Sequence, residues 1–357
     1  MDKFFKGVFF IMQYYTKDQQ ADPVVDIFKT EEAISFIKRY FQDALAESLN
    51  LMRVSAPLFV SRDSGIQDNL NGIERPVSFP IKSLNGKVYE IVQSLAKWKR
   101  FALARYKVPA GKGIYTDMNA LRPDEEDLTT SIHSVYVDQW DWEKVMSPEE
   151  RNLEYLKSTV RKIYQAIRKT ENAVCEKFSC EPFLPEDIAF VHTEDLLSMY
   201  PGKKQAEREN AISMEKKAVF IIGIGGELQD GSLHDGRAPD YDDWTTPTGN
   251  GKKGLNGDIF VWNPVLERGF EISSMGIRVD RETMIKQLEI RGCKERMEMP
   301  WHSMLLAGKL PQSVGGGIGQ SRLCMLLLRK HHIGEVQVSV WPEEVQAYCS
   351  EKGINLL

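Results

Sequence analysis

The chain has 357 residues, of which 42% are hydrophobic and 27% charged, a composition typical of a globular protein with a large apolar core. Its net charge of −5 lacks the basic surplus that proteins bound to RNA or DNA usually carry, so no nucleic-acid partner is predicted. The five cysteines are odd in number and form no C-x-x-C pair. They therefore favour a reducing, cytoplasmic location over a disulfide framework or a zinc ribbon.

The N-terminal residues carry an apolar cluster, from Phe4 to Met12, that is too short to span a bilayer and precedes no small-residue cleavage site. We interpret residues 1–25 as an N-terminal extension, either a leader or a packed segment. No other segment approaches transmembrane length, so no membrane contact is predicted. Residues 26–357 are rich in loop-forming types over 230–253 but contain no linker, and we predict that they form a single catalytic domain.

The first strong periodic signal is a helix over about residues 31–48, which Thr30 can cap and which places its apolar residues on one face. The apolar stretch that follows, residues 51–59, contains Pro57. Because proline removes a ladder hydrogen bond from a central strand, we expect this stretch at a sheet edge or at an interface.

Farther along the chain, the patterns predict both strands and helices. Strands are expected over residues 87–92, 134–140, 218–222, 258–262 and 269–273, and helices over 94–105, 148–178 and 321–329. The two kinds of element mix without a regular βαβ rhythm. This arrangement favours an α+β fold, with a central antiparallel sheet flanked by helices, over a doubly wound parallel sheet.

Two segments have the residue types of a phosphate site. Arg122 precedes acids at 124–126, and its planar guanidinium can reach a phosphate while the acids hold an amino group or an adenine edge. Four glycines within 315–319 are expected to form a turn before an apolar helix, where free N–H groups favour an anion and Arg322 would face it. The alternatives are a solvated surface turn and a turn that is glycine-rich for structural reasons alone.

A third segment carries oxygen ligands suited to Mg²⁺ on a nucleotide. Strand alternation is expected to place Glu271 and Ser273 on one face, with Ser274 following at the strand's end. Asp258 on the preceding strand is a candidate second acid, and Arg278 can neutralise a carboxylate or a phosphate. The alternative is a half-buried strand with capped polar ends.

A fourth segment carries Lys97 and Lys99, whose spacing makes them point in different directions on a helix. One lysine is expected to face inward and pair an anion while the others are solvated; the alternative is that all are solvated. Elsewhere, the glycines at 223–226 lack the third glycine of a dinucleotide fingerprint, because Leu228 stands there. No P-loop, metalloprotease or nucleophile-elbow motif occurs.

Together these segments resemble the three motifs of the class II aminoacyl-tRNA synthetases. Arg122 with Glu125 is similar to motif 2 and the glycines before Arg322 to motif 3. The helix and strand around Pro57 resemble motif 1, which forms the dimer interface in that superfamily. Longer phrases resemble one family, the ammonia-dependent asparagine synthetases or aspartate–ammonia ligases: residues 67–70, 94–100, 120–125, 133–143, 237–244, 254–258 and 273–278. The resemblance is nearly full-length and fades over the first 25 residues and near the C-terminus.

The resemblance implies a class II synthetase-like catalytic domain that makes asparagine from L-aspartate, ammonia and ATP, with Mg²⁺, in a homodimer. ATP would convert the β-carboxylate into an acyl-adenylate with release of pyrophosphate, and ammonia would then displace AMP. Adenylation is needed because oxide is a poor leaving group. Arginines and Mg²⁺ would stabilise the negative charge that builds at the α-phosphate.

The resemblance also implies roles for individual residues. The ATP-binding candidates are Arg122, which would bridge the α-phosphate and the reacting carboxylate, Arg322 at the γ-phosphate, and Glu125, Glu271 and Gly317. Mg²⁺ would be bound by Glu271 with Asp258 or Ser274. The substrate-binding candidates are Lys99 and Ser94 at the α-carboxylate of aspartate, Arg278 as a second candidate for that group, and Ser274. Gln139 would orient the acyl group, and Asp68, Asp141 and Asp242 would hold the amino group or the ammonium.

Two other functions are compatible with these motifs. An aspartyl- or asparaginyl-tRNA synthetase would share the chemistry but carries an anticodon-binding OB-fold of ~100 residues before motif 1, for which the chain has no room ahead of the helix at 31. A non-catalytic synthetase paralogue could lose Arg122, Glu271 and Arg322 freely, yet all three are present. A glutamine-dependent synthetase is disfavoured because no cysteine stands at the N-terminus.

Overall fold

The computed structural model describes residues 27–68, 70, 74–124 and 128–357, so the predicted extension and Glu125 lie outside the described residues. The helices are α2 (Ile27–Leu49), α3 (Ala96–Arg105), α4 (Leu153–Phe178), α5 (Thr193–Met199), α6 (Gln205–Lys216), α7 (Arg281–Ile290), α8 (Pro300–Leu306), α9 (Gln320–Leu327) and α10 (Glu343–Lys352). The strands are β1 (Leu51–Arg53), β2 (Phe59–Ser61), β3 (Ser78–Ile81), β4 (Lys87–Ile91), β5 (Gly113–Leu121), β6 (Tyr136–Val145), β7 (Ala189–His192), β8 (Ala218–Ile222), β9 (Pro247–Gly249), β10 (Lys252–Lys253), β11 (Asn256–Asn263), β12 (Arg268–Ile277) and β13 (Ser313–Gly319).

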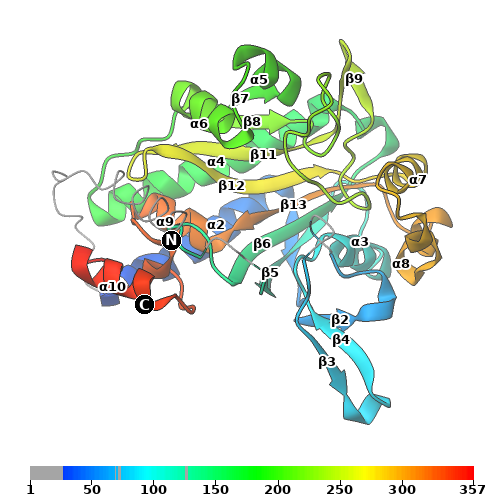
Figure 1. Cartoon of the computed structure of the whole chain (residues 1–357), viewed down its shortest axis with the longest axis horizontal. Helices are drawn as coiled ribbons and strands as arrows, with labels where there is room; N and C mark the ends of the chain where they lie inside the picture. Colours follow the sequence, from blue (N-terminus) through cyan, green and yellow to red (C-terminus); the bar gives the residue numbers. More distant parts are fainter. Residues whose placement is uncertain (1–26, 69, 71–73, 125–127) are drawn as a thin grey trace.

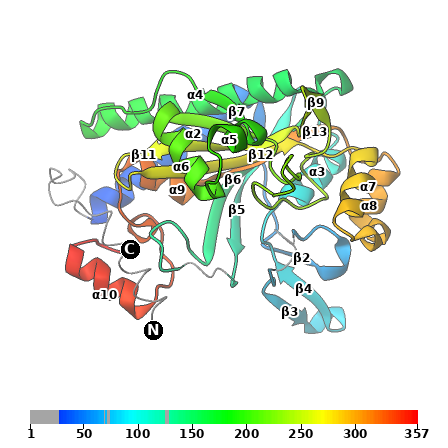
Figure 2. The same cartoon turned by 45° about the horizontal axis from the view of Figure 1, so that its top comes forward.

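Eight of these strands form a central sheet in the order β1-β5-β6-β13-β12-β11-β8-β7. Neighbours from β5 to β8 pair antiparallel, whereas the two edge pairs, β1 with β5 and β7 with β8, are parallel. A separate three-stranded sheet, β2-β4-β3, projects from the body of the molecule (Figures 1 and 2). The predicted α+β fold with a central antiparallel sheet flanked by helices is confirmed, and the parallel edges are an addition to it.

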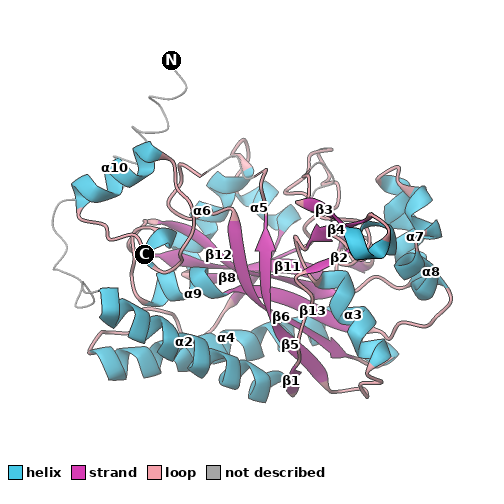
Figure 3. Cartoon of the chain, turned by 90° about the horizontal axis from the view of Figure 1, so that it is seen from below, coloured by secondary structure: helices cyan, strands magenta, loops and turns pink. Residues whose placement is uncertain are grey.

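The two faces of the central sheet differ in character because side chains alternate along each strand. On β6, Trp140 and Trp142 are fully buried on one face. Helices α2 and α4 cover that face and run side by side along it (Figure 3). The opposite face carries α5 and α6 over β8 and β11, and α3 over β5 and β6. The polar residues of β6, Gln139, Asp141 and Glu143, therefore lie on the face that carries α3, α5 and α6.

Helix α2 extends beyond the predicted range at both ends, so Thr30 lies inside the helix and does not cap it. Its apolar stripe is fully buried in the chain's own core, where the ring of Phe41 lies 4.6 Å from that of Trp140. Packing against the sheet and α4 therefore accounts for the periodicity of this segment. The expected edge strand is present as β1, but Pro57 lies between β1 and β2 and belongs to neither.

The glycine-rich segment was predicted to form a turn, and that prediction is wrong. The segment forms the strand β13, which lies between β6 and β12 in the middle of the sheet. Glycine has low strand propensity, yet here the neighbouring strands leave no space for a side chain. A Cβ added at Gly316 would lie 2.5 Å from Met275 Cβ and 2.6 Å from the Ser274 carbonyl oxygen. Close approach of the neighbouring strand, and not a turn conformation, therefore requires glycine at 316, whereas Cβ atoms at Gly315 and Gly317 would meet the side chains of Glu143 and Gln139.

The other predicted elements match the structure to within a few residues, with β6 shifted toward the C-terminus and β12 longer than expected. The long helix expected over 148–178 divides into a 3-10 turn, Pro148–Glu150, and α4. Within the described residues, no helix is both long and apolar enough to cross a membrane.

Candidate active site

A cavity of about 900 Å³ opens on the polar face of the sheet. It brings together these predicted residues: Asp68, Ser94, Lys99, Arg122, Gln139, Asp141, Asp242, Asp258, Glu271, Ser274, Arg278 and Gly317. A smaller cavity of about 110 Å³ adjoins it, shares Arg122, Gln139, Glu271, Ser274 and Gly317, and is also lined by Arg322. The predicted residues thus lie around two connected cavities, except Glu125, whose position is outside the described residues.

Arg122 stands directly after β5 and enters both cavities. One of its Nη atoms donates to the carbonyl oxygen of Gln93 at 3.3 Å. Its Nε is buried and has no hydrogen-bond partner among the described residues. A buried N–H group without a partner is costly unless an anion completes its bonding, which suits a phosphate or carboxylate site.

Helix α3 places Lys99 at the centre of the cavity wall. Its ammonium group pairs with the Asp141 carboxylate and donates to the carbonyl oxygen of Gly316 at 2.9 Å. Burial lowers the pKa of Lys99. The expectation that the neighbouring cations are solvated is wrong: Lys97 pairs with buried Asp240 at 3.0 Å, and Arg100 donates to two carbonyl oxygens in the interior. Both sides of α3 are packed against other parts of the chain. The charge of its lysine and arginine side chains therefore did not indicate that they are exposed to solvent.

Arg278, at the end of β12, lies in a buried network of acids. Its guanidinium donates to both carboxylate oxygens of Glu143, at 2.8 to 3.1 Å, and pairs with Asp242. Ser313 also donates to Glu143 at 2.7 Å. Burial acts to raise the pKa of Glu143, but Arg278 outweighs it and holds the value below the usual range. The sequence reasoning missed Glu143, because alternation alone did not show that its face of β6 is a polar cavity.

The metal-binding candidates lie together on β11 and β12, with one correction to their arrangement. The pairing of the two strands shifts register between Ile259 and Phe260, so β12 contains an extra residue there. Glu271 and Ser274 consequently line the main cavity with Asp258, whereas Ser273 is buried and donates to the carbonyl oxygen of Gly317 at 2.9 Å. The predicted pairing of Glu271 with Ser273 on one face is therefore wrong for the main cavity, although both residues line the smaller cavity.

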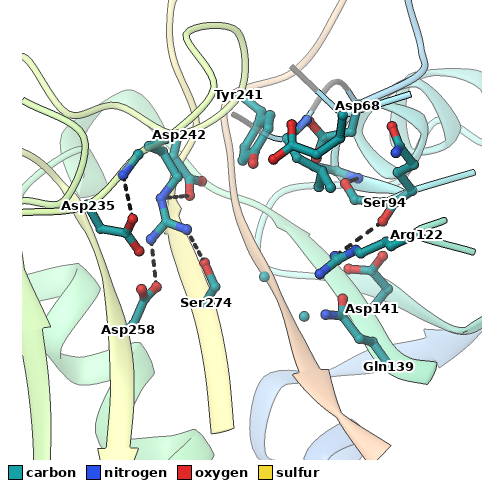
Figure 4. Close-up of a pocket in the computed structure, with 18 of the residues that line it drawn as sticks. Asp68, Ser94, Arg122, Gln139, Asp141, Asp235, Tyr241, Asp242, Asp258 and Ser274 are labelled. Carbon is teal, nitrogen blue, oxygen red and sulfur yellow. Dashed lines mark hydrogen bonds and ion pairs between the residues drawn. The ribbon is translucent and has the colours of Figure 1, made fainter. Parts of the chain in front are cut away.

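Arg237, which the sequence reasoning did not single out, contacts two of these candidates. It donates to the Ser274 hydroxyl and to Asp258 at 2.6 Å, and lies 3.6 Å from Asp242 (Figure 4). It comes from the loop-rich stretch between β8 and β11, where no periodic pattern could place it. Its presence in a phrase that resembles the asparagine synthetases was the available signal.

The acids around Arg237 have shifted pKa values. Burial, together with the nearby Glu271 carboxylate, raises the pKa of Asp258 to about 7 despite the attraction of Arg237. Burial also acts to raise the pKa of Glu271, but Arg322, which donates to it at 3.1 Å, and Arg237 hold that pKa below its usual value. Two neighbouring carboxylates that repel each other, one of them buried, are sites that a further cation would stabilise.

These residues fit Mg²⁺ as partial ligands. Among the described residues, no group of three or more histidine, cysteine, aspartate or glutamate side chains could hold a metal by itself. Asp258, Glu271 and Ser274 supply two carboxylates and a hydroxyl, all oxygen ligands of the kind that Mg²⁺ prefers. Because Mg²⁺ usually keeps waters and nucleotide phosphates as its remaining ligands, a complete protein cage is not required.

Comparison with known proteins adds independent information. The family model for aspartate-ammonia ligase matches residues 28–353. An aspartate–ammonia ligase of Parabacteroides distasonis is 54% identical over 347 residues, which cover 97% of this chain and 100% of that protein. One of Clostridium tetani is 55% identical over 337 residues, which cover 93% of this chain and 95% of that protein.

Solved structures of lower identity share the fold. An asparaginyl-tRNA synthetase from Pyrococcus horikoshii complexed with asparaginyl-adenylate has a TM-score of 0.63 at 15% identity, over 88% of this chain and 70% of that one. An asparaginyl-tRNA synthetase from Entamoeba histolytica has a TM-score of 0.62 at 14% identity, over 89% and 68% of the two chains. The predicted class II synthetase-like fold is thereby confirmed. With a family match that spans nearly all of its described residues, the chain belongs to the aspartate–ammonia ligase family.

Proposed function

We propose that this aspartate–ammonia ligase makes L-asparagine through a β-aspartyl-adenylate formed in the main cavity. ATP is attacked by the β-carboxylate of aspartate and pyrophosphate leaves; ammonia then displaces AMP. The observation that carries the proposal is the gathering of three cations, half-buried Arg122 and buried Lys99 and Arg278, around one cavity that acids also line. Such a site can bind an anionic nucleotide and a zwitterionic amino acid at once.

For ATP, we assign Arg122 to the α-phosphate and Arg322 to the γ-phosphate, with Glu125 and Gly317 as further contacts. The unused Nε of Arg122 supports the first assignment, because charge develops at the α-phosphate when the carboxylate attacks. The second is supported by the position of Arg322 in the adjoining cavity, so that a phosphate chain would extend from one cavity into the other.

For aspartate, we assign Lys99 to the α-carboxylate, with Ser94 and Arg278 beside it. Each cation is already paired with an acid, Lys99 with Asp141 and Arg278 with Asp242. Neighbouring charges of both signs match the two charges of an amino-acid zwitterion. Gln139, on the same face of β6, would orient the acyl group, and Ser274 would contact it from β12.

Mg²⁺ is assigned to Glu271 with Asp258 and Ser274, because these residues supply two carboxylates and a hydroxyl as oxygen ligands. When bound, it would neutralise phosphate charge during adenylation. We further propose that residues 26–357 act as one catalytic domain in the cytoplasm.

We also propose a homodimer, although the apolar stripe of α2 no longer supports it because that stripe is buried within the chain. The support comes instead from large apolar side chains exposed in the edge strand β1 and at the start of β2: Met52, Leu58 and Phe59 are 63%, 53% and 40% exposed. Light scattering at micromolar concentration should give twice the mass of the chain. A monomer would contradict the proposal.

The reaction is tested by following pyrophosphate and asparagine from ATP, Mg²⁺ and L-aspartate, with and without ammonium. Asparagine formed only with ammonium, together with AMP and not ADP, is the expected result. Pyrophosphate release without asparagine would indicate a relative that transfers the adenylate elsewhere, and a tRNA-charging assay would then identify a tRNA acceptor. Release of ADP would refute the adenylate.

A further inference from the structure

One side of the main cavity is formed by residues 237–245, over which the structure describes neither helix nor strand. The side chains of Arg237, Tyr241 and Asp242 line the cavity from this segment. Its backbone meets the end of the central sheet at an isolated bridge between Asp242 and Arg278. A buried segment without regular backbone pairing needs other partners for its polar groups, and those partners determine where its cavity side chains lie.

Gln287 on α7 supplies such partners. It is fully buried and belongs to the lining of neither active-site cavity. Its amide nitrogen donates to the carbonyl oxygens of Pro239 and Asp242, each at 2.9 Å. Its amide oxygen accepts the N–H of Trp244 at 2.9 Å and the hydroxyl of Thr245 at 3.3 Å. An amide side chain has two N–H donors and two acceptor lone pairs, so all four are used on this one segment.

Helix α7 is a fixed support for Gln287. Arg151, just before α4, donates to Asp280 at the start of α7 at 3.1 Å and pairs with Asp243 inside the segment. Met284 and Leu288 of α7 are fully buried in an apolar cluster that includes residues of α8. The helix is therefore held at its first turn and along one face, and Gln287 couples its position to the segment.

Asp242 connects Gln287 to the proposed aspartate site. Its carbonyl oxygen is held by Gln287, whereas its carboxylate pairs with Arg278 and lies 3.6 Å from Arg237. Arg122 lies across the cavity from it (Figure 4). Because the backbone and side chain of one residue move together, a displacement of the Asp242 backbone would displace the acid–cation pair that matches the charges of the amino-acid substrate.

Other contacts would keep the segment folded if the Gln287 amide were lost. Buried Asp240 pairs with Lys97 at 3.0 Å and lies 2.9 Å from Nε2 of His302. The pair of Asp243 with Arg151 is also independent of Gln287. Removal of the amide should therefore shift the segment by a small distance without releasing it from the body of the protein.

We propose that Gln287 is a positioning residue for the aspartate substrate: it holds the backbone of residues 239–245 so that Asp242 and Arg278 meet the amino and carboxylate groups of aspartate. This inference rests on the proposed aspartate site. A purely structural role gives a different expectation. Loss of a satisfied buried amide would then lower the free energy of unfolding without changing the affinity of the folded enzyme for aspartate.

The test compares Gln287→Met with Asn263→Leu in the full-length enzyme. Each variant replaces a fully buried amide by an apolar side chain of similar size. Asn263 ends β11 and lines neither active-site cavity, and its oxygen accepts the N–H groups of Val265 at 2.9 Å and Leu266 at 3.1 Å. The measurements are kcat for asparagine formation, the KM values for aspartate and ATP, and the midpoint of urea denaturation.

The two variants should differ in substrate affinity and not in stability alone. We expect Gln287→Met to raise the KM for aspartate by about 10-fold, because a small displacement of orienting groups weakens their contacts. Its kcat and its KM for ATP should stay within about threefold of the original values. Asn263→Leu should lower the urea midpoint and leave both KM values within about threefold.

Other outcomes would overturn the inference. An unchanged KM for aspartate in Gln287→Met, with a loss of stability like that of Asn263→Leu, would leave the residue a structural role only. Equal rises in the KM values for aspartate and ATP would indicate general distortion of the cavity. Asp242→Asn separates this inference from the proposed function. An unchanged KM for aspartate in Asp242→Asn would overturn the proposed aspartate site, whereas a raised KM there and a normal one in Gln287→Met would overturn the role of Gln287 alone.

A second variant keeps the test decisive if Gln287→Met fails to fold. Gln287→Glu retains the shape of the side chain and an oxygen that can accept the N–H of Trp244, and it replaces the amide nitrogen that faces the two carbonyl oxygens. The KM for aspartate should rise severalfold, and an unchanged KM would overturn the inference. Combined with Asp242→Asn, Gln287→Glu should add less than its separate effect, because both changes act on the same contact; full additivity would show that Gln287 does not act through Asp242.

Discussion

Replacing Gly317 by alanine tests whether the position of the Gln139 amide controls the reaction. A Cβ added at Gly317 would stand 2.1 Å from Gln139 Oε1 and 3.3 Å from Asp141 Oδ1. Ordinary van der Waals contact begins at 3.4 Å, so the amide oxygen must move by about 1.3 Å. Because a displacement of about 1 Å in an orienting group can lower a rate by roughly 10²-fold, we expect asparagine formation to fall by about that factor.

The same substitution should leave the fold nearly unchanged. The atom that must move is the far end of a flexible side chain that borders a cavity. Alanine also loses less backbone entropy on folding than glycine, by about 0.5–1 kcal/mol. The free energy of unfolding should therefore stay within about 1 kcal/mol of the original value, as measured by urea denaturation.

Gly316→Ala provides the contrast. Its Cβ would meet the backbone oxygen of Ser274 and Cβ of Met275, neither of which can move without separating β13 from β12. We expect a loss of about 2–3 kcal/mol in the free energy of unfolding. Gly226→Ala, whose nearest contact would be the Trp244 carbonyl oxygen at 3.3 Å, is the control for inserting a methyl group.

Two results would refute this reasoning. Normal asparagine formation by Gly317→Ala would show that the reaction does not depend on the placement of the Gln139 amide. Destabilisation of Gly317→Ala as large as that of Gly316→Ala would show that the strand, and not the amide, yields to the added methyl group.

Three further predictions use other parts of the structure. Arg122→Ala should lower kcat/KM for asparagine formation by roughly 10²-fold, about 3 kcal/mol, with an unchanged urea midpoint; near-normal turnover would place Arg122 outside the reaction. Glu143→Gln should lower the free energy of unfolding by about 3 kcal/mol, because it leaves buried Arg278 with fewer partners; a loss below about 1 kcal/mol in urea denaturation would contradict this. Burial lowers the pKa of His332 to about 4 from 6.5, so the unfolded chain binds a proton that the folded chain does not. The free energy of unfolding should therefore fall by about 2 kcal/mol between about pH 7 and pH 5 through this residue, and His332→Asn should show a smaller fall; equal falls would refute the assignment.

Much of the fold could be predicted because its elements carry strong local patterns. The apolar stripe of α2 has a clear helical period, and the short, β-branched apolar run of β8 is typical of a buried strand. The cavity residues could be named because charged and glycine-rich segments cluster in phrases that resemble the asparagine synthetases. The local pattern of residue types thus reveals whether a segment is a helix or a strand and which of its faces is apolar.

The remaining features depend on neighbours distant in sequence. Gly315–Gly317 form a strand only because β6 and β12 lie on either side of it. Lys97 is buried because Asp240, 143 residues away, neutralises it. The bulge that turns Ser274 toward the cavity arises from the pairing of β11 with β12, so the sequence of neither strand alone indicates it.

The hydrogen bonds that hold the cavity also tie together distant parts of the chain. Lys97 to Asp240, Glu143 to Arg278 and Lys99 to Gly316 span 143, 135 and 217 residues. Because each of these contacts joins segments far apart in the sequence, the cavity is complete only when both halves of the chain have folded together. A nucleotide that binds only the completed cavity would stabilise the entire native state, by about 2.7 kcal/mol at one hundred times its Kd. Substrate supply would therefore protect the enzyme from unfolding and from the proteases that act on unfolded chains.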